Sequence, residues 1–231
     1  MTTQEKNGIT EGVIWKQLLI FFFPILVGSF FQQLYNTVDS VIVGQFVGKE
    51  ALSSVGGSAG QIISLVVGFF TGVSTGATVI ISQYFGAGKK EEIEESLHTA
   101  YAFALVGGLV LGIAGIVFAP QMLRWMNTPE ELIAESVLYV RVYFSGLIFI
   151  FIYNMGAAIL RAVGDSKRPL YYLIVCSVVN IILDLLLILV IPLGVLGAAI
   201  ATLIAQAVSA VLVICLSGIR FPPRTLRRIG N

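Results

Sequence analysis

Six long apolar runs dominate the hydrophobic pattern of this chain. They cover residues 15–46, 62–85, 97–119, 132–160, 170–191 and 197–219, and the second has a polar lead-in from residue 51. A membrane-spanning helix needs about 20 mainly apolar residues, and each run is long enough. The strands of a membrane barrel would instead alternate apolar and polar side chains over about 10 residues. The pattern predicts an all-α membrane protein with six transmembrane helices.

Composition supports lipid as the surrounding medium. The 231 residues are 57% hydrophobic and 12% charged, and the mean hydropathy is +0.92. Soluble domains carry about 25% charged residues. One globular core cannot bury so much apolar surface, so we expect a multi-pass protein of the cell (cytoplasmic) membrane.

Basic residues gather in alternate loops and at both ends of the chain. On one predicted side lie 11 of the 14 Lys and Arg residues: Lys6, Lys16, Lys89, Lys90, Arg161, Lys167, Arg168, Arg220, Arg224, Arg227 and Arg228. The remaining three, Lys49, Arg124 and Arg141, fall on or near the other side. Because basic loops stay in the cytoplasm, both termini are predicted to be cytoplasmic. Three regions follow: an N-terminal segment (1–14), a six-helix transmembrane lobe (15–219) and a basic tail (220–231).

Small residues form two groups in the predicted helices. Gly68, Gly72 and Gly76 recur every four residues in the second apolar run. A second group crowds the start of the sixth run: Gly194, Gly197, Ala198, Ala199 and Ala201. Small side chains let membrane helices approach closely, so both groups are predicted to mark close helix packing.

Two acidic residues, Asp39 and Asp184, lie inside apolar runs, whereas the other eleven of the thirteen lie in loops, termini or helix ends. An aspartate at the bilayer centre costs about 2.5–3.5 kcal/mol on insertion scales. Side chains that costly normally face a bundle interior or an aqueous cavity. The two aspartates are therefore the best pointers to function.

Each aspartate has polar neighbours at helical spacing. Gln32 and Asn36 share a helix face with Asp39, and Asn180 lies one turn before Asp184. Thr202 follows the small residues of the sixth run, where close packing would bring it near. One interpretation is that these groups only join helices through hydrogen bonds. Amides and hydroxyls would do so without the cost of carboxylates, which favours a functional site.

Two buried carboxyls can hold an ion. Desolvation disfavours the charged form of a carboxyl, and a second carboxyl nearby disfavours it further, so the pair can bind a proton as one coupled unit. Carboxylate, amide, hydroxyl and carbonyl oxygens also suit a small hard cation. The sequence has no nucleotide-binding loop and no HExxH motif. These features indicate an ion-coupled transporter, and we do not expect an enzyme.

Pro24 lies in the middle of the first predicted helix. Proline removes a helical hydrogen bond and favours a kink. A passive bend and a moving bend both fit this position.

Four segments resemble the multidrug and toxic compound extrusion (MATE) family. They are QQLYNTVDSVIVGQFVGKEALSSVG (32–56), ISQYFGAGKKEEIEES (81–96), LRAVGDSKRP (160–169) and PLGVLGAAIATLIAQ (192–206). The resemblance runs in order from Trp15 to Ser217. It implies a cation-coupled antiporter that exports drugs or other amphipathic compounds by alternating access, driven by Na⁺ or H⁺. It implies no other cofactor and no nucleic-acid partner; the partners are amphipathic or cationic small molecules and the lipid bilayer.

The resemblance also implies roles for individual residues. The cation or proton site would comprise Asp39, Asn180, Asp184 and Thr202, with Na⁺ possible at these four and the Ala198 carbonyl as an extra ligand. Tyr139 and Asn154 would be outer members of the same network. Gln33 and Asn36 are assigned to the substrate cavity or its network from their place beside or on the helix face of Asp39. Pro24 would match the proline whose bend couples protonation to substrate release.

One departure concerns length, because family members have twelve helices in two lobes and this chain has six predicted helices, equivalent to the N-terminal lobe. The chain is then a truncated product, or two copies pair. Lobes with even helix numbers share one orientation, so a parallel homodimer could replace the second lobe. Rival interpretations are a lipid-linked saccharide flippase of the same superfamily and a non-transporting fragment. The flippase would need a more basic cavity than these spans provide.

Overall fold

The computed structural model describes residues 14–216, and these residues form helices joined by short turns. The helices are α1 (Ile14–Ile42), α2 (Lys49–Gly56), α3 (Ser58–Gly86), α4 (Lys90–Trp125), α5 (Glu130–Ser145), α6 (Leu147–Ala162), α7 (Lys167–Asp184) and α8 (Val195–Leu216). Two π-helical turns, η1 (Val43–Val47) and η2 (Leu185–Val190), extend α1 and α7. The all-α prediction is confirmed. The predicted tail 220–231, and all of the N-terminal segment except Ile14, lie outside the described residues.

The predicted spans agree with the helices, with one difference. Five stretches are long and apolar enough to cross a membrane: Trp15–Val47, Lys49–Gly86, Lys90–Trp125, Lys167–Val190 and Val195–Cys215. The sixth, Glu130–Ser145 with Leu147–Ala162, is bent by 49° between α5 and α6. The sequence predicted a continuous helix over 132–160, because nothing in its hydropathy marks this bend.

The α5–α6 bend packs against a row of glycines on α4. A Cβ at Gly108 would lie 2.8 Å from Ile148 Cα, and one at Gly112 would lie 2.9 Å from the Phe144 carbonyl oxygen. A Cβ at Gly115 would overlap the Phe144 ring. These contacts are closer than real Cβ atoms make, so only glycine lets the α5–α6 bend approach α4 this closely.

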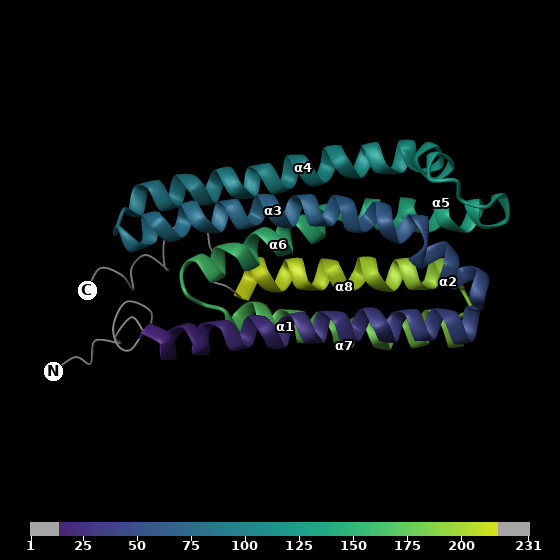
Figure 1. Ribbon diagram of the computed structural model, residues 1–231, viewed down its shortest axis with the longest axis horizontal. Helices are drawn as coiled ribbons and strands as arrows, with labels where there is room; N and C mark the ends of the chain where they lie inside the picture. Colours follow the sequence, from purple (N-terminus) through teal and green to yellow (C-terminus); the bar gives the residue numbers. More distant parts are fainter. Residues whose placement is uncertain (1–13, 217–231) are drawn as a thin grey trace.

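The helices pack in neighbouring pairs. Helix α1 lies along α7, α7 packs against α8, and α4 packs against α5 and α6 (Figure 1). The starts of α1 and α7 and the loop between α3 and α4 lie at one end of the bundle, on the left in Figure 1. We call this the basic end, because Lys16, Lys89 and Lys167 belong to these segments. Segments that the sequence placed on one side of the membrane therefore lie at one end of the structure.

The two groups of small residues have different outcomes. Ala198, Ala199 and Ala201 on α8 are fully buried, and a Cβ at Gly197 would lie 3.1 Å from the Leu187 carbonyl oxygen. Close packing is thus confirmed for the sixth run. For the glycines of α3 the prediction of close packing is wrong within the described chain: Gly68, Gly72 and Gly76 are exposed, and an added Cβ would meet no atom within 4 Å. Small residues permit close contact but do not force it, and these face outward.

Candidate functional site

The carboxyls of Asp39 on α1 and Asp184 on α7 face each other. The two side chains are close enough for a hydrogen bond between them. Asp184 is fully buried and Asp39 is half-buried. The packing of α1 along α7 brings these residues together, although 144 positions separate them in the chain. The central pair predicted from the sequence therefore forms one cluster in the structure.

This cluster contains buried polar atoms that lack partners. Within residues 14–216, both Asp184 carboxyl oxygens, Asp39 Oδ1, and the Asn180 Nδ2 and Oδ1 atoms have no hydrogen-bonding partner of complementary type. Folded proteins leave few such groups, and each costs about 1–3 kcal/mol. Ionised carboxyls only accept hydrogen bonds, so a shared proton or a bound cation is needed to join the two. The arrangement suits reversible ion binding.

A group of three tyrosines lies beside the carboxyl pair. Tyr139 on α5 is buried and lies within electrostatic range of both Asp39 and Asp184. Tyr35, one turn before Asp39, and Tyr143, one turn after Tyr139, belong to the same cluster. The Tyr139 and Tyr143 ring centroids are 6.2 Å apart. The sequence reasoning identified Tyr139 but missed Tyr35 and Tyr143, although their four-residue spacing from Asp39 and Tyr139 was a usable signal.

Other predicted ligands lie on α7 and α8. Asn180 is 1% exposed and precedes Asp184 by one helical turn. Thr202 and Ala198 are buried on α8, the helix that packs against α7. The structure therefore places these three residues in the buried α7–α8 part of the lobe, next to the helix that carries Asp184.

The predicted cavity residues are less closely associated with the pair. Gln33 and Asn36 on α1 are exposed, and their backbone carbonyls accept hydrogen bonds from Thr37 (2.9 Å) and Ser40 (2.8 Å). Asn154 on α6 is half-buried and donates from Nδ2 to the Ile150 carbonyl at 2.8 Å. The Asn154 amide thus bonds to its own helix.

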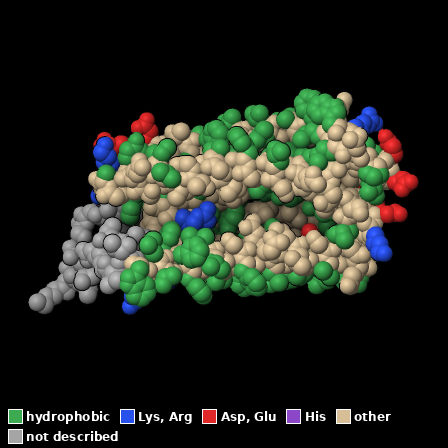
Figure 2. Space-filling view, in the orientation of Figure 1, with side chains coloured by type: hydrophobic (Ala, Val, Ile, Leu, Met, Phe, Trp, Pro, Cys, Tyr) green, Lys and Arg blue, Asp and Glu red, His purple; other side chains and the backbone are tan. Residues whose placement is uncertain are grey.

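A hollow separates α1 from α3. Figure 2 shows it on the face seen in Figure 1, with a basic and an acidic side chain visible in it. It exists because α1 packs mainly along α7 and not across the bundle. Asp39 lies on the helix that borders this hollow and is only half-buried.

Both carboxyls lie beside π-helical turns. Asp184 directly precedes η2, Asp39 lies three residues before the end of α1, and η1 and η2 contact each other. π-helical turns interrupt the regular hydrogen-bond ladder and frequently occur at functional sites. Pro24 is buried further down α1, which continues through it as one helix.

The donor atoms at this site are oxygens and an amide nitrogen. Among the described residues there is no group of three or more His, Cys, Asp or Glu side chains that could hold a metal ion. Hard cations bind carboxylate, amide and hydroxyl oxygens more readily than softer transition metals do. The residues present fit Na⁺ or a proton as the bound ion.

The fold and the site define a polytopic, all-helical membrane protein with a buried carboxyl pair between two of its helices. Residues 24–186 match the MatE family, and the chain belongs to this family. It is 34% identical to the probable multidrug resistance protein YoeA of Bacillus subtilis, over 89% of this chain and 44% of YoeA.

Solved structures agree with this assignment. A MATE transporter in the bent conformation is 26% identical, with a TM-score of 0.86 over 98% of this chain and 51% of the other. An inward-facing MATE transporter is 28% identical, with a TM-score of 0.74 over 79% of this chain and 41% of the other. The chain thus spans about half the length of the relatives that it matches.

Proposed function

We propose that this chain is the N-terminal lobe of a cation-coupled antiporter that exports amphipathic organic compounds across the cytoplasmic membrane. The observation that carries the proposal is the facing pair Asp39 and Asp184, three of whose four carboxyl oxygens are buried without a hydrogen-bond partner among the described residues. Such a pair is costly to keep in an apolar bundle, and residues with this cost typically have a functional role.

The pair provides a way to couple an ion to helix movement. With a proton or Na⁺ between them, the carboxyls attract and hold α1 against α7. Without it, two like charges at this distance repel in a poorly solvated setting. The ion therefore favours one placement of α1 over another, and α1 borders the hollow. An ion shifts such an equilibrium only through its different affinity for the two states. This is the requirement for alternating access.

Two features of the relatives support the proposed substrates and the proposed alternating access. The relation to a probable multidrug resistance protein supports drug-like, amphipathic substrates. A relative solved in an inward-facing conformation supports alternation between two accessible states.

A second lobe is part of the proposal. The hollow is open on the side seen in Figure 2, and the glycine stripe of α3 (Gly68, Gly72 and Gly76) faces outward without a covering side chain. Small residues at four-residue spacing are typical of close contacts between membrane helices. The partner surface would come from a second lobe or from a parallel copy of this chain.

Flux measurements test the coupling. We expect proteoliposomes containing the chain to export a fluorescent organic cation when an inward gradient of H⁺ or Na⁺ is imposed. Collapsing that gradient with an ionophore should stop the export, because the cargo moves only with the counter-ion. Empty liposomes are the control. Export that is unchanged after both gradients collapse would contradict ion coupling.

Mass measurement tests the pairing. If two copies replace a second lobe, native mass spectrometry from nanodiscs should show a species of twice 24.9 kDa. Leucine at Gly68 should shift this species to the monomer, because its side chain would hold the facing helices apart. A monomer with full export activity would contradict the pairing.

A further inference from the structure

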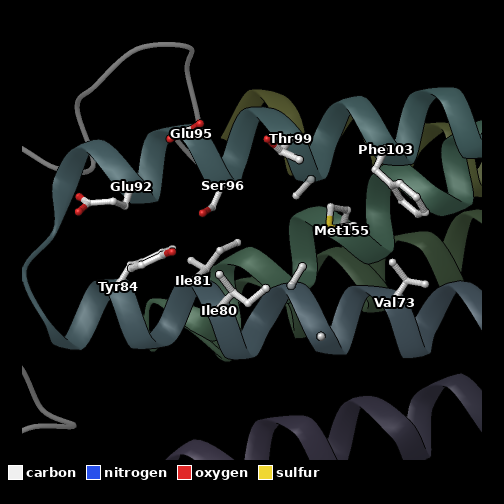
Figure 3. A pocket seen from close by; sticks show the side chains of 13 residues that line it. Val73, Ile80, Ile81, Tyr84, Glu92, Glu95, Ser96, Thr99, Phe103 and Met155 are labelled. Atoms are coloured by element: carbon white, nitrogen blue, oxygen red, sulfur yellow. The ribbon is translucent and has the colours of Figure 1, made fainter.

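A cavity of about 610 Å³ lies outside the carboxyl site, between α3 and α4. We call it the α3–α4 pocket. Figure 3 shows its side chains on these two helices, with Met155 of α6 between them. Its volume is within the range of about 300–1,000 Å³ typical of small-molecule sites. Neither Asp39 nor Asp184 lines it, so it is separate from the site described above.

One end of the α3–α4 pocket is polar and acidic. Tyr84, Glu92, Glu95 and Ser96 lie toward the loop between α3 and α4, at the basic end of the bundle (Figure 3). The pocket lining includes these two glutamates and no Lys or Arg. The charge that the lining presents is therefore negative.

Lys89 already places a positive charge beside the acidic end of the α3–α4 pocket. Its Nζ lies 3.1 Å from Glu92 Oε1 and 5.9 Å from the centroid of the Tyr84 ring. Both members of this ion pair are at least 40% exposed, and exposed pairs of this kind are weak. An incoming ammonium group can compete with Lys89 for Glu92. No salt bridge between described residues involves Glu95.

The other end of the α3–α4 pocket is apolar. Val73, Phe103 and Met155 line it, and Phe103 and Val73 lie furthest from the loop (Figure 3). Gly76 contributes open space, since a Cβ added there would meet no atom within 4 Å. An apolar chain fits this part, and its burial gains roughly 0.8 kcal/mol per methylene.

We propose that the α3–α4 pocket binds amphipathic organic cations, with the cationic head at Glu92 and Glu95 and the apolar tail beside Phe103 and Met155. The polarity of the pocket follows that of a membrane: its acidic end lies near the end of the bundle, and its apolar end lies deeper along the spans. A molecule that enters the membrane head-outward would present both parts in the matching order. The pocket is then a binding site for such cations before they reach the hollow.

The test measures equilibrium binding to the full chain in nanodiscs and needs no transport. Tritiated dodecyltrimethylammonium is the probe, and empty nanodiscs give the lipid background. We expect Gly76→Leu to weaken saturable binding about tenfold or more, because its side chain fills the pocket. Gly72→Leu is the matched control: it lies one turn earlier on the same exposed stripe, where it would disturb pairing with a second lobe equally, but it lies outside the pocket and should leave binding of the probe unchanged.

The charge is tested separately. The double variant Glu92→Gln/Glu95→Gln should bind the cation about three- to fivefold more weakly, as expected for one half-exposed and one exposed charge, and should bind tritiated dodecanol unchanged. These surface changes leave the fold intact even if Gly76→Leu does not. Equal affinity for the cation and the alcohol, with no effect of the double variant, would show a groove for lipid chains and overturn the proposal.

A final arm separates this site from the carboxyl pair. Binding should persist in Asp39→Asn/Asp184→Asn, whose central site is neutral. Binding that is lost in this variant but kept in Gly76→Leu would place the cation at the carboxyl pair, which would overturn the present inference and leave the proposed antiporter standing. Absence of saturable binding to the unmodified chain would also overturn the inference.

Discussion

Replacing Asp184 by asparagine should reduce ion-coupled export to background and, at the same time, stabilise the folded lobe. Asparagine has nearly the same shape, but its amide can donate a hydrogen bond to Asp39. The pair then no longer needs a proton or cation, so the coupling ion has nothing to bind. The same substitution gives a partner to buried acceptors that lack one. We expect a gain of about 1–3 kcal/mol in the free energy of unfolding.

The change in stability is best measured in Na⁺-free buffer at alkaline pH, where neither a proton nor Na⁺ bridges the two carboxyls. A gain of this size corresponds to a rise of about 2–4 °C per kcal/mol in Tm for a chain of this length. Glu50→Gln is the control, because it removes an exposed carboxyl at the start of α2. Retained gradient-driven export in Asp184→Asn, or a lower Tm than the unmodified chain, would contradict the assigned role. A gain in stability with a loss of activity is typical of functional sites.

The second large effect is expected at Gly115, where alanine should destabilise the lobe by about 1–3 kcal/mol through overpacking. A Cβ at this position would overlap the Phe144 ring close to its attachment point, where the ring cannot easily move aside. Helix α4 would have to move away from the α5–α6 bend. Thermal unfolding in detergent, followed by circular dichroism, measures the change.

Two further variants make this prediction specific. Gly68→Ala is also a change inside a helix, but its Cβ meets open space, so the better helix propensity of alanine should raise stability by up to about 1 kcal/mol. Phe144→Leu should rescue Gly115→Ala in part, because the smaller side chain leaves room for the new methyl group. Equal effects of Gly115→Ala and Gly68→Ala would show that helix propensity, and not packing against Phe144, decides.

Much of the fold could be predicted from hydropathy alone. In lipid, backbone groups must be satisfied within each span, so a long apolar run has to form a helix. That constraint explains why the predicted spans and the helices agree, including the placement of Lys89 and Lys167 at one end. The α5–α6 bend escaped prediction because it depends on glycines of α4, which lie some thirty residues earlier in the chain.

The candidate site divides in the same way. Asp39 and Asp184 could be identified from the sequence because a charge inside an apolar run is costly wherever it points. Their contact with each other and with Tyr139 required the packing of α1 on α7 and of α5 nearby. Tyr35 and Tyr143 were missed because a tyrosine in a membrane helix carries no such cost.

By itself, then, the sequence determined which segments span the membrane, which ends of the spans lie together and which two carboxyls are exceptional. Only the tertiary structure decided that these carboxyls share one site, that the glycines of α4 and not those of α3 lie in close contacts within the lobe, and that a pocket lies between α3 and α4. The physical reason is that cost and periodicity are properties of a single segment, whereas contact depends on which faces of distant segments pack together.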